Sequence, residues 1–344
     1  MVEDIDVEQL IDWMMQQQVE VIDVRSPQEY SEGTVPGSWN IPLFNDAERG
    51  EIGTIYKQQS IEAAKDRGLE IVSAKLPHYI RELQAIPKRK VFFCWRGGMR
   101  SKTAATLYSL LSGKVYRLKG GYRAYRRWVV QTMATYEWKP TLIVINGYTG
   151  TGKTKILRSL HHQGYPVLDL EQLAGHRGSI FGGVGLKPQN QRSFDALLVH
   201  ECIRLQHSPY VIMEAESRRI GKIVLPDFLI EARIKSPQLF IRLPLDVRVA
   251  SIIEDYEPHR FALECMEAFR HIERKIHTPA AASIRASLLQ GEYAEATRLL
   301  LLHYYDPRYE FKISEYPLER FLLDADSISQ AETKVKDFII QQSL

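Results

Sequence analysis

The chain has 344 residues, and its 45 Lys and Arg residues against 42 Asp and Glu residues give a formal net charge of +3. With 44% hydrophobic and 25% charged residues, the composition is that of a globular protein and excludes a collagen-like or largely disordered chain. No apolar run approaches the roughly 20 residues of a membrane span, and the N-terminus is acidic where a secretory leader is basic and then apolar. The three cysteines are too few for a disulfide framework or a cysteine-rich zinc site. We therefore expect a cytoplasmic protein of about two domains with no membrane partner.

The first part of the chain alternates short apolar segments with segments of helical periodicity. Strands are predicted over residues 19–24, 91–94 and 114–118, and helices over residues 80–86 and 101–111. Strands that alternate with helices form a parallel sheet covered on both faces. This part of the chain is therefore predicted to be an α/β domain.

A second series of strands begins after Pro140, which cannot continue the helix predicted before it. These strands are predicted over residues 141–147, 165–170, 210–215 and 238–243. From about residue 246 onward the pattern is rich in helix. We therefore predict one parallel-sheet domain over residues 1–138 and a second, with a helical C-terminal region, over residues 139–344.

A glycine-rich loop with a cysteine follows the strand predicted over residues 91–94. Cys94 opens the segment Cys-Trp-Arg-Gly-Gly-Met-Arg-Ser, after which a helix is predicted. Backbone N–H groups and the positive end of the helix dipole converge in such a loop and bind anions. Arg96 and Arg100 on the same loop favour the reactive thiolate form of Cys94. We infer a catalytic Cys94 assisted by Arg96 and Arg100; the alternative is a buried cysteine that only ends a strand.

A second glycine-rich loop has the pattern of a phosphate-binding loop. Residues 147–154 fit G-x-x-x-x-G-K-[ST], between a predicted strand and a predicted helix. Gly147, Gly150 and Gly152 allow backbone N–H groups to approach phosphate oxygens, and Lys153 supplies a positive charge. The hydroxyl of Thr154 can hold a Mg²⁺ ion. The sequence therefore predicts phosphate binding with Mg²⁺ as the metal, and it indicates no redox cofactor.

Acidic residues follow two of the strands of the second domain. Glu214 and Glu216 end the strand predicted over residues 210–215, where one of them can order Mg²⁺ or act as a base. The alternative is an ion pair with Arg218 or Arg219 in an exposed turn. Asp169 and Glu171, at the end of the segment over residues 165–171, form a weaker version of the same pattern.

Three further segments leave alternatives open. The glycine-rich residues 175–183 are either a loop that closes over a ligand or a plain surface loop. Basic and aromatic residues alternate over residues 114–128, which suits either stacking of unpaired RNA bases or a solvated helix face with buried aromatics. The polar and aromatic residues 301–309 either line the phosphate pocket or pack the C-terminal helices. Cys202 and Cys265 lie in helical patterns and are expected in the core.

The segments around Cys94 resemble the rhodanese (sulfurtransferase) family. Residues 22–42 resemble its opening signature and residues 118–125 its closing signature. The resemblance implies that Cys94 is a nucleophile that carries a persulfide or selenide, and that Asp23 and Arg25 hold the scaffold together. Thr34 stands where rhodaneses usually have histidine, a position that we interpret as structural. The loop from Cys94 to Arg100 is one residue longer than the common sulfurtransferase loop, and this spacing equally suits a cysteine phosphatase.

The whole chain resembles the tRNA 2-selenouridine synthase family. The segments that carry this resemblance are the cysteine loop, the phosphate loop and residues 53–58, 214–221 and 304–307. It implies a rhodanese-like domain followed by a P-loop NTPase-like domain. It also implies that wobble 2-thiouridine in tRNA is converted to 2-selenouridine with selenophosphate, and that a geranyl group is transferred from geranyl diphosphate to the sulfur. The phosphate loop would then bind the prenyl diphosphate, and Cys94 would accept or direct selenium.

Two other classes of enzyme fit the same motifs. An ATP-dependent enzyme can activate a substrate for sulfur transfer from Cys94. A cysteine phosphatase fused to a nucleotide-binding module suits the spacing of Cys94 and Arg100. The phosphate-loop pattern alone does not distinguish geranyl diphosphate, selenophosphate and a nucleotide as its ligand.

Overall fold

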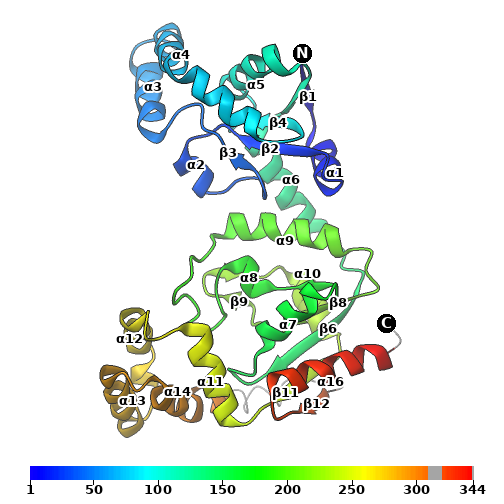
Figure 1. The fold of residues 1–344 in the computed structure, drawn as a ribbon, viewed down its shortest axis with the longest axis vertical. Coiled ribbons are helices and arrows are strands. Elements are labelled where there is room, and N and C mark those ends of the chain that lie inside the picture. The colour runs from blue at the N-terminus through cyan, green and yellow to red at the C-terminus, as the bar shows by residue number, and fades with distance from the viewer. Residues whose placement is uncertain (309–319, 343–344) are drawn as a thin grey trace. The chain divides into compact units, whose positions relative to one another are not determined.

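The computed structural model describes residues 1–308 and 320–342, and the chain forms two compact units (Figure 1). The first unit comprises residues 1–135 together with residues 195–200, and the second comprises residues 136–194 and 201–344. Each unit has its own five-stranded sheet. No helix within the described ranges combines the length and the apolar composition that crossing a lipid bilayer requires.

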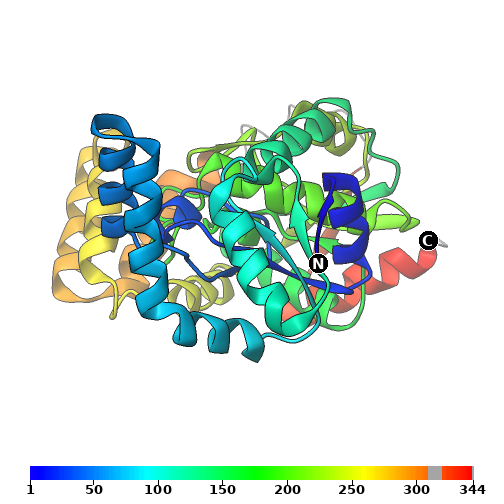
Figure 2. The ribbon, with the colours of Figure 1, turned by 90° about the horizontal axis from the view of Figure 1, so that it is seen from above.

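The first unit is a parallel sheet with helices. Its elements in chain order are β1 (Val2–Ile5), α1 (Val7–Met15), β2 (Val19–Asp23), α2 (Pro27–Ser31), β3 (Trp39–Asn40), α3 (Asp46–Gln58), α4 (Ile61–Ala85), β4 (Arg89–Phe93), α5 (Met99–Ser112), β5 (Val115–Leu118) and α6 (Gly121–Thr135). The strand order is β1-β5-β4-β2-β3, and all pairings are parallel. Helices α3 and α4 lie side by side (Figure 2).

The predicted strands of this unit are confirmed as β2, β4 and β5. The helix predicted over residues 80–86 is the end of the longer α4, which continues through Pro77. Strands β1 and β3 were not predicted, because they are short and lie at the two edges of the sheet. Edge strands bury little apolar surface and therefore leave a weak sequence pattern.

The second unit repeats this architecture with more helix. Its elements in chain order are β6 (Thr141–Gly147), α7 (Lys153–His162), β7 (Val167–Leu168), α8 (Leu170–Ala174), α9 (Gln191–Leu205), β8 (Tyr210–Glu214), β9 (Arg219–Ile220), β10 (Ile223–Val224), α10 (Asp227–Ile234), β11 (Gln238–Arg242), α11 (Leu245–Tyr256), α12 (Ala262–Arg270), η1 (Glu273–Lys275), α13 (Thr278–Gln290), α14 (Tyr293–Leu300), η2 (Leu301–Tyr305), β12 (Arg320–Asp324) and α16 (Ile328–Gln341). Of α9, residues 195–200 are grouped with the first unit. The main sheet has the order β12-β11-β6-β8-β7 and is parallel throughout, and β9 and β10 form a small antiparallel ribbon.

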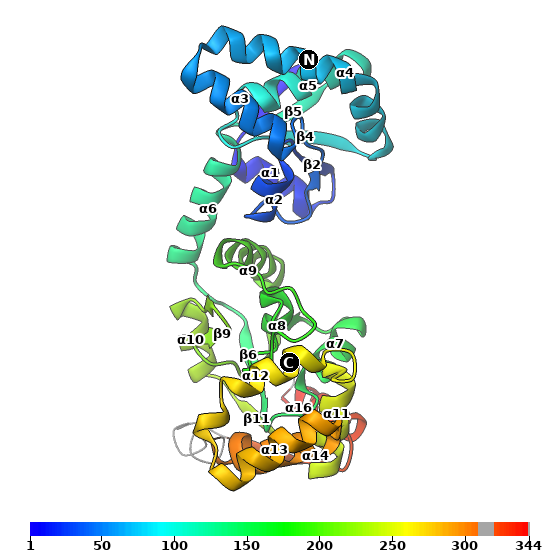
Figure 3. The same ribbon diagram turned by 90° about the vertical axis from the view of Figure 1, so that its left-hand side faces the viewer.

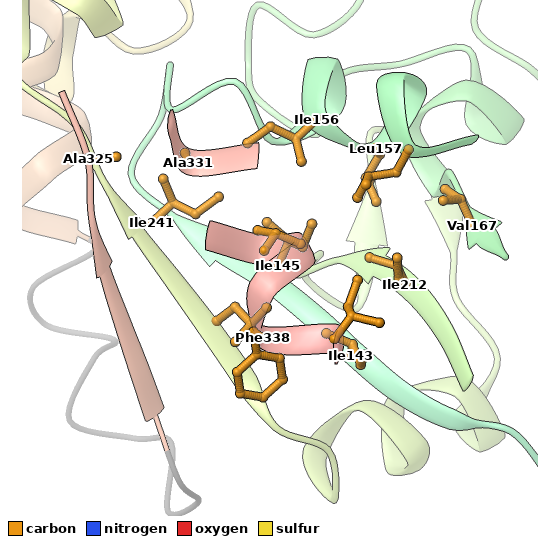
Figure 4. Close-up of a cluster of buried hydrophobic side chains, with 14 of the residues drawn as sticks. Ile143, Ile145, Ile156, Leu157, Val167, Ile212, Ile241, Ala325, Ala331 and Phe338 are labelled. Atoms are coloured by element: carbon orange, nitrogen blue, oxygen red, sulfur yellow. The ribbon is translucent and has the colours of Figure 1, made fainter. Parts of the chain in front are cut away.

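The core of the second unit lies between this sheet and the helices α7 and α16 (Figure 4). Ile143 and Ile145 of β6 are fully buried beside Ile156 of α7 and Phe338 of α16. Strand β6 is central in the sheet and is apolar along most of its length, as the continuous apolar run over residues 141–147 predicts. The loop that follows β6 is thereby anchored on the most buried strand of the unit.

The C-terminal third of the chain departs from its prediction in one respect. Helices α11 to α14 confirm the helix-rich pattern, and α13 and α14 lie side by side around a core of their own (Figure 3). Strand β12 was not predicted, yet it extends the sheet by pairing in parallel with β11. Leu322 of β12 is 56% exposed, so this edge strand lacks the continuous apolar run that identified the inner strands.

A buried ion pair braces the first unit at the end of β2. Arg25 contacts Asp23 at 2.6 Å, and the two side chains are 1% and 0% exposed. The same guanidinium donates to the carbonyl of Gly33 at 2.6 Å and lies over the ring of Tyr122. Thr34 donates to Asp23 at 2.8 Å. All these contacts are internal to the scaffold, as expected for Asp23, Arg25 and Thr34.

We expect Arg25→Ala to lower the free energy of unfolding of the first unit by about 3–5 kcal/mol, because it leaves the buried Asp23 carboxylate without its cation. Urea denaturation followed by hydrogen exchange at peptides from β2 measures this loss. Arg67→Ala is the control, since the Arg67–Glu51 pair is exposed to solvent and its loss should leave the free energy of unfolding nearly unchanged. Equal losses in the two variants contradict the role of the Arg25 pair.

Candidate functional site

The predicted phosphate loop connects β6 to α7 in the conformation that such loops require. Gly152 precedes the first residue of α7 and has a φ of +73°, in the left-handed region. A Cβ atom on Gly152 would lie 2.7 Å from Ile328, and one on Gly150 would lie 2.8 Å from the carbonyl oxygen of Arg248. The loop therefore passes so close to its neighbours that only glycine fits at these two positions.

Lys153 and Thr154 begin α7 and point their polar groups at the loop and at an acidic side chain. The Lys153 ammonium donates to the carbonyls of Gly147 at 3.0 Å and Tyr148 at 3.2 Å. The Thr154 hydroxyl donates to Glu171 Oε2 at 2.8 Å. The ammonium thus lies over the loop, where a phosphate oxygen can replace the carbonyls as its partner.

The loop is braced from the side by a residue that the sequence analysis did not identify. Arg248 of α11 is 4% exposed and donates from Nε to the carbonyl of Thr149 at 2.9 Å. Its guanidinium also pairs with Asp306 at 2.6 Å. Asp306 belongs to the motif at residues 304–307, but Arg248 lies 58 residues away from it along the chain, so no local sequence pattern joins the two.

Several carboxyl groups gather at the same edge of the sheet. Glu214 ends β8 and is 1% exposed; its Oε1 accepts a hydrogen bond from the backbone N–H of Glu171 at 2.9 Å. Its Oε2 has no hydrogen-bond partner among the described residues. Glu171 and Glu216 hydrogen-bond to each other. The alternative in which Arg218 or Arg219 pairs with one of these carboxylates is wrong: Arg218 pairs with Asp227, and among the described residues no ion pair joins Arg219 to either carboxylate.

Burial and mutual repulsion change the protonation of this cluster. Burial, with the nearby charges of Asp169, Glu171 and Glu216, raises the pKa of Glu214 well above its usual range. Burial and the charge of Glu171 raise the pKa of Glu216 to about 8. The cluster therefore retains protons at neutral pH, and it favours a cation that can replace them.

The residues at the loop fit a Mg²⁺ ion held together with a phosphate group. Mg²⁺ uses one or two carboxylates, together with substrate phosphates and waters. The Thr154 hydroxyl, the Glu171 carboxylate and the unpartnered oxygen of Glu214 supply that chemistry. Within the ranges that the structure describes, no three His, Cys, Asp or Glu side chains are arranged to hold a metal by themselves. The donor set therefore suits a metal that arrives with a phosphate ligand.

A cavity of about 880 Å³ opens beside the phosphate loop. The residues 177–180 from the glycine-rich segment line it, together with Lys153, Glu216, Tyr304 and Arg308. The segment at residues 301–309 therefore does line the phosphate pocket, although Tyr309 lies outside the described residues. The cavity offers a positive loop, an acidic edge and aromatic walls to one ligand.

The cysteine loop of the first unit leaves β4 and enters α5. Cys94 is 3% exposed, and its Sγ lies 3.2 Å from the hydroxyl of Ser101. The Cys94 carbonyl accepts from the backbone N–H of Tyr122 at 2.8 Å, which ties the loop to the start of α6. A Cβ atom on Gly121 would lie 2.1 Å from that carbonyl oxygen. The loop is thus held in place by its backbone.

The two loop arginines differ in their surroundings. Arg100 forms a paired contact with Glu29 of α2, at 2.5 and 3.1 Å. Although burial opposes it, the hydrogen bonds and charge of Arg100 lower the pKa of Glu29. Arg96 is exposed and forms no ion pair with any residue that the structure describes. An anion that binds at this loop therefore competes with Glu29 for Arg100.

The other predicted features of the chain are placed as follows. Cys202 and Cys265 are buried, as expected for core residues. Tyr116, Tyr122 and Tyr125 are also buried, and Arg117 pairs with Asp4. These buried rings do not support base stacking by residues 114–128 and favour the solvated-face interpretation.

Together, the two units define a protein with a rhodanese-like domain and a phosphate-loop domain, each with its glycine-rich loop at the end of a buried strand. The family model of the rhodanese-like domain matches residues 6–127, and that of the tRNA 2-selenouridine synthase AAA domain matches residues 140–273. These matches and the two parallel sheets confirm the predicted fold class, a rhodanese-like α/β domain followed by a P-loop NTPase-like α/β domain.

Relatives over most of the chain identify the family. A tRNA 2-selenouridine synthase of Bdellovibrio bacteriovorus is 33% identical over 342 residues, which covers 86% of this chain and 89% of the relative. One of Nitrosomonas europaea is 34% identical over 291 residues, covering 81% and 75% of the two chains. The chain belongs to the tRNA 2-selenouridine synthase family.

The raised pKa of Glu216 predicts that the stability of the second unit falls as pH rises. The native carboxyl keeps its proton up to about pH 8, whereas the unfolded one loses it near pH 4.5. The stability that the protonated Glu216 contributes is therefore fully present below about pH 4.5 and is lost as the pH rises through about 8. We expect the free energy of unfolding of Glu216→Gln to fall less steeply with pH than that of the wild type, by up to about 1.4 kcal/mol per pH unit.

Chemical denaturation between pH 5 and pH 8, with hydrogen exchange at peptides from β8, measures this slope. The control is Glu231→Gln on α10, where the side chain is exposed. An unchanged slope in Glu216→Gln contradicts the assignment.

Proposed function

We propose that this chain converts wobble 2-thiouridine in tRNA to 2-selenouridine by two group transfers. In the first, a geranyl group moves from geranyl diphosphate to the sulfur; in the second, selenium from selenophosphate replaces the alkylated sulfur. The overall reaction is supported by the name that its relatives carry. The observation that best supports a diphosphate donor is the cavity of about 880 Å³ beside the phosphate loop.

In the first transfer, the thiocarbonyl sulfur attacks C1 of geranyl diphosphate. A sulfur–carbon bond forms, the carbon–oxygen bond breaks and diphosphate leaves, while the uridine N3–H loses its proton to water. The loop amides and Lys153 bind the diphosphate and stabilise its growing charge. The Thr154 hydroxyl would hold a Mg²⁺ ion, which would supply Lewis-acid stabilisation of the same leaving group. Alkylation converts a poor leaving group into a thiol that departs easily.

In the second transfer, Cys94 releases selenide from selenophosphate. The thiolate attacks phosphorus, the phosphorus–selenium bond breaks and hydrogen selenide leaves; water later hydrolyses the phosphocysteine. Selenide adds to C2 of the base, geranyl thiol departs and 2-selenouridine remains. The spacing from Cys94 to Arg100 suits a tetrahedral phosphoryl group, and the Ser101 hydroxyl at 3.2 Å can stabilise the thiolate. Neither transfer changes an oxidation state, so neither needs a redox cofactor.

Lys153→Ala tests the first transfer. We expect kcat/KM for geranylation to fall at least about a hundredfold, because the charge that stabilises the leaving diphosphate is removed. Mass spectrometry of nucleosides from 2-thiouridine tRNA measures the product. The control is Lys222→Ala, an exposed lysine outside the cavity lining, which should stay within about twofold. Normal geranylation by Lys153→Ala overturns this assignment.

Cys94→Ser tests the second transfer. We expect geranylation to continue and selenium incorporation to fall at least about a hundredfold, because a serine hydroxyl is a far weaker nucleophile than a thiolate. Cys202→Ser, which alters another buried thiol, is the control and should retain selenation. Undiminished selenium incorporation by Cys94→Ser removes Cys94 from the mechanism.

One experiment decides between the proposed reaction and its rivals. The purified chain is incubated with 2-thiouridine tRNA, geranyl diphosphate and selenophosphate, and each donor is omitted in turn. Geranyl addition with the first donor, followed by selenium-for-sulfur exchange with both, supports the proposal and orders the steps. An unchanged nucleoside from folded protein overturns it. ATP turnover stimulated by tRNA then favours the activating enzyme, and hydrolysis of aryl phosphates favours the phosphatase.

A further inference from the structure

A second, smaller cavity of about 50 Å³ adjoins the phosphate cavity in the second unit. It lies among α11 to α14. The residues that line both cavities are Thr149, Ser179, Ile252, Tyr256 and Tyr305. A ligand with its anionic end at the phosphate loop can therefore extend past these residues into the smaller cavity.

The wall of the smaller cavity is mostly apolar. Its deeper part is formed by Phe181, Cys265, Leu288, Ala296 and Leu300. Among the hydroxyl groups of its lining, those of Ser179 and Tyr256 lie 3.1 Å apart and hydrogen-bond to each other.

This wall discriminates between two kinds of phosphate ester. A nucleotide base would bury N–H and C=O groups there with few partners, which is unfavourable. A hydrocarbon chain needs no such partners, and each methylene that it buries raises affinity about fourfold. The combination of a phosphate loop and an adjoining apolar cavity therefore suits an amphipathic diphosphate.

We propose that the cavity among α11 to α14 binds the hydrocarbon end of an allylic prenyl diphosphate, and that Ala296 and Leu288 limit the length of the chain accepted. This inference rests on the proposed function, in which the phosphate loop binds the diphosphate. A cavity of about 50 Å³ admits the terminus of a chain, and the rest of the chain lies in the larger cavity beside Ile252 and Tyr305.

The helices offer matched pairs of positions for a test. Ala296 of α14 is 1% exposed and lines the cavity, whereas Ala294, two residues earlier on the same helix, is exposed. Leu288 of α13 lines the cavity, whereas the adjacent Leu289 is 72% exposed. The same substitution at each member of a pair therefore differs mainly in whether it changes the cavity.

The experiment uses the full chain and 2-thiouridine tRNA with dimethylallyl, geranyl and farnesyl diphosphates, which carry five, ten and fifteen carbons. Mass spectrometry of nucleosides gives kcat/KM for each donor. We expect Ala296→Phe to lower the ratio of geranyl to dimethylallyl transfer at least about tenfold, because the ring occupies the space of the chain terminus. Leu288→Ala should raise the ratio of farnesyl to geranyl transfer at least about fivefold. Ala294→Phe and Leu289→Ala should leave both ratios unchanged.

The outcomes separate this inference from the proposed function. Wild-type protein that transfers geranyl, together with cavity variants that keep the wild-type ratios, overturns the inference and leaves the proposed function intact. Wild-type protein that transfers no prenyl group from any donor overturns the proposed function itself. Thermal-shift titration with inorganic pyrophosphate checks that each variant keeps a working phosphate loop. If Ala296→Phe fails this check, the Leu288→Ala and Leu289→Ala pair decides the question.

Discussion

Parallel strand pairing is the constraint on which both sites depend, because it brings the carboxyl ends of neighbouring strands to one edge of a sheet. In the second unit, Ile145 of β6 lies opposite Glu214 of β8, so the phosphate loop begins beside a buried carboxyl group. In the first unit, β4 and β5 are neighbours, and the N–H of Tyr122 beyond β5 binds the carbonyl of Cys94 beyond β4. Backbone pairing thus positions each loop before any side chain contributes.

The two loops balance charge in opposite ways. At the phosphate loop, the carboxyl groups of Glu171 and Glu216 lie near Lys153, with Glu214 beside them, and burial keeps protons on all three. A cation that binds there with a phosphate group replaces protons, so ligand binding and proton release are linked. At the cysteine loop, the cation Arg100 is already neutralised by Glu29. Binding of an anion at that loop is therefore an exchange of partners.

Features formed by neighbouring residues were predictable from the sequence, and features formed between distant residues were not. The inner strands and both glycine-rich loops follow from local patterns, because each is a continuous run of residues in one environment. The pair of Arg100 with Glu29 joins positions 71 residues apart, and that of Arg248 with Asp306 joins positions 58 apart. Strand β12 is specified mainly by its pairing with β11.

The smaller cavity could not be predicted for the same reason. Its wall combines side chains from α11 to α14, and each of these helices alone shows only the amphipathic pattern of a helix that packs on a core. The exposed Ala294 and the cavity-lining Ala296 differ only in the face of α14 on which they lie.

The polarity of the two sites separates the two proposed donors. The phosphate loop opens toward both an acidic edge and an apolar cavity, so its ligand is expected to be anionic at one end and hydrocarbon along the rest. The cysteine loop holds a thiol that is 3% exposed and carries two arginines, Arg96 and Arg100, which suits a small anion. A prenyl chain gains nothing from such a loop, and a small anion gains nothing from the apolar cavity. In the proposed reaction, selectivity between the two donors is therefore expected to follow from the solvation of each ligand, before any recognition of the tRNA.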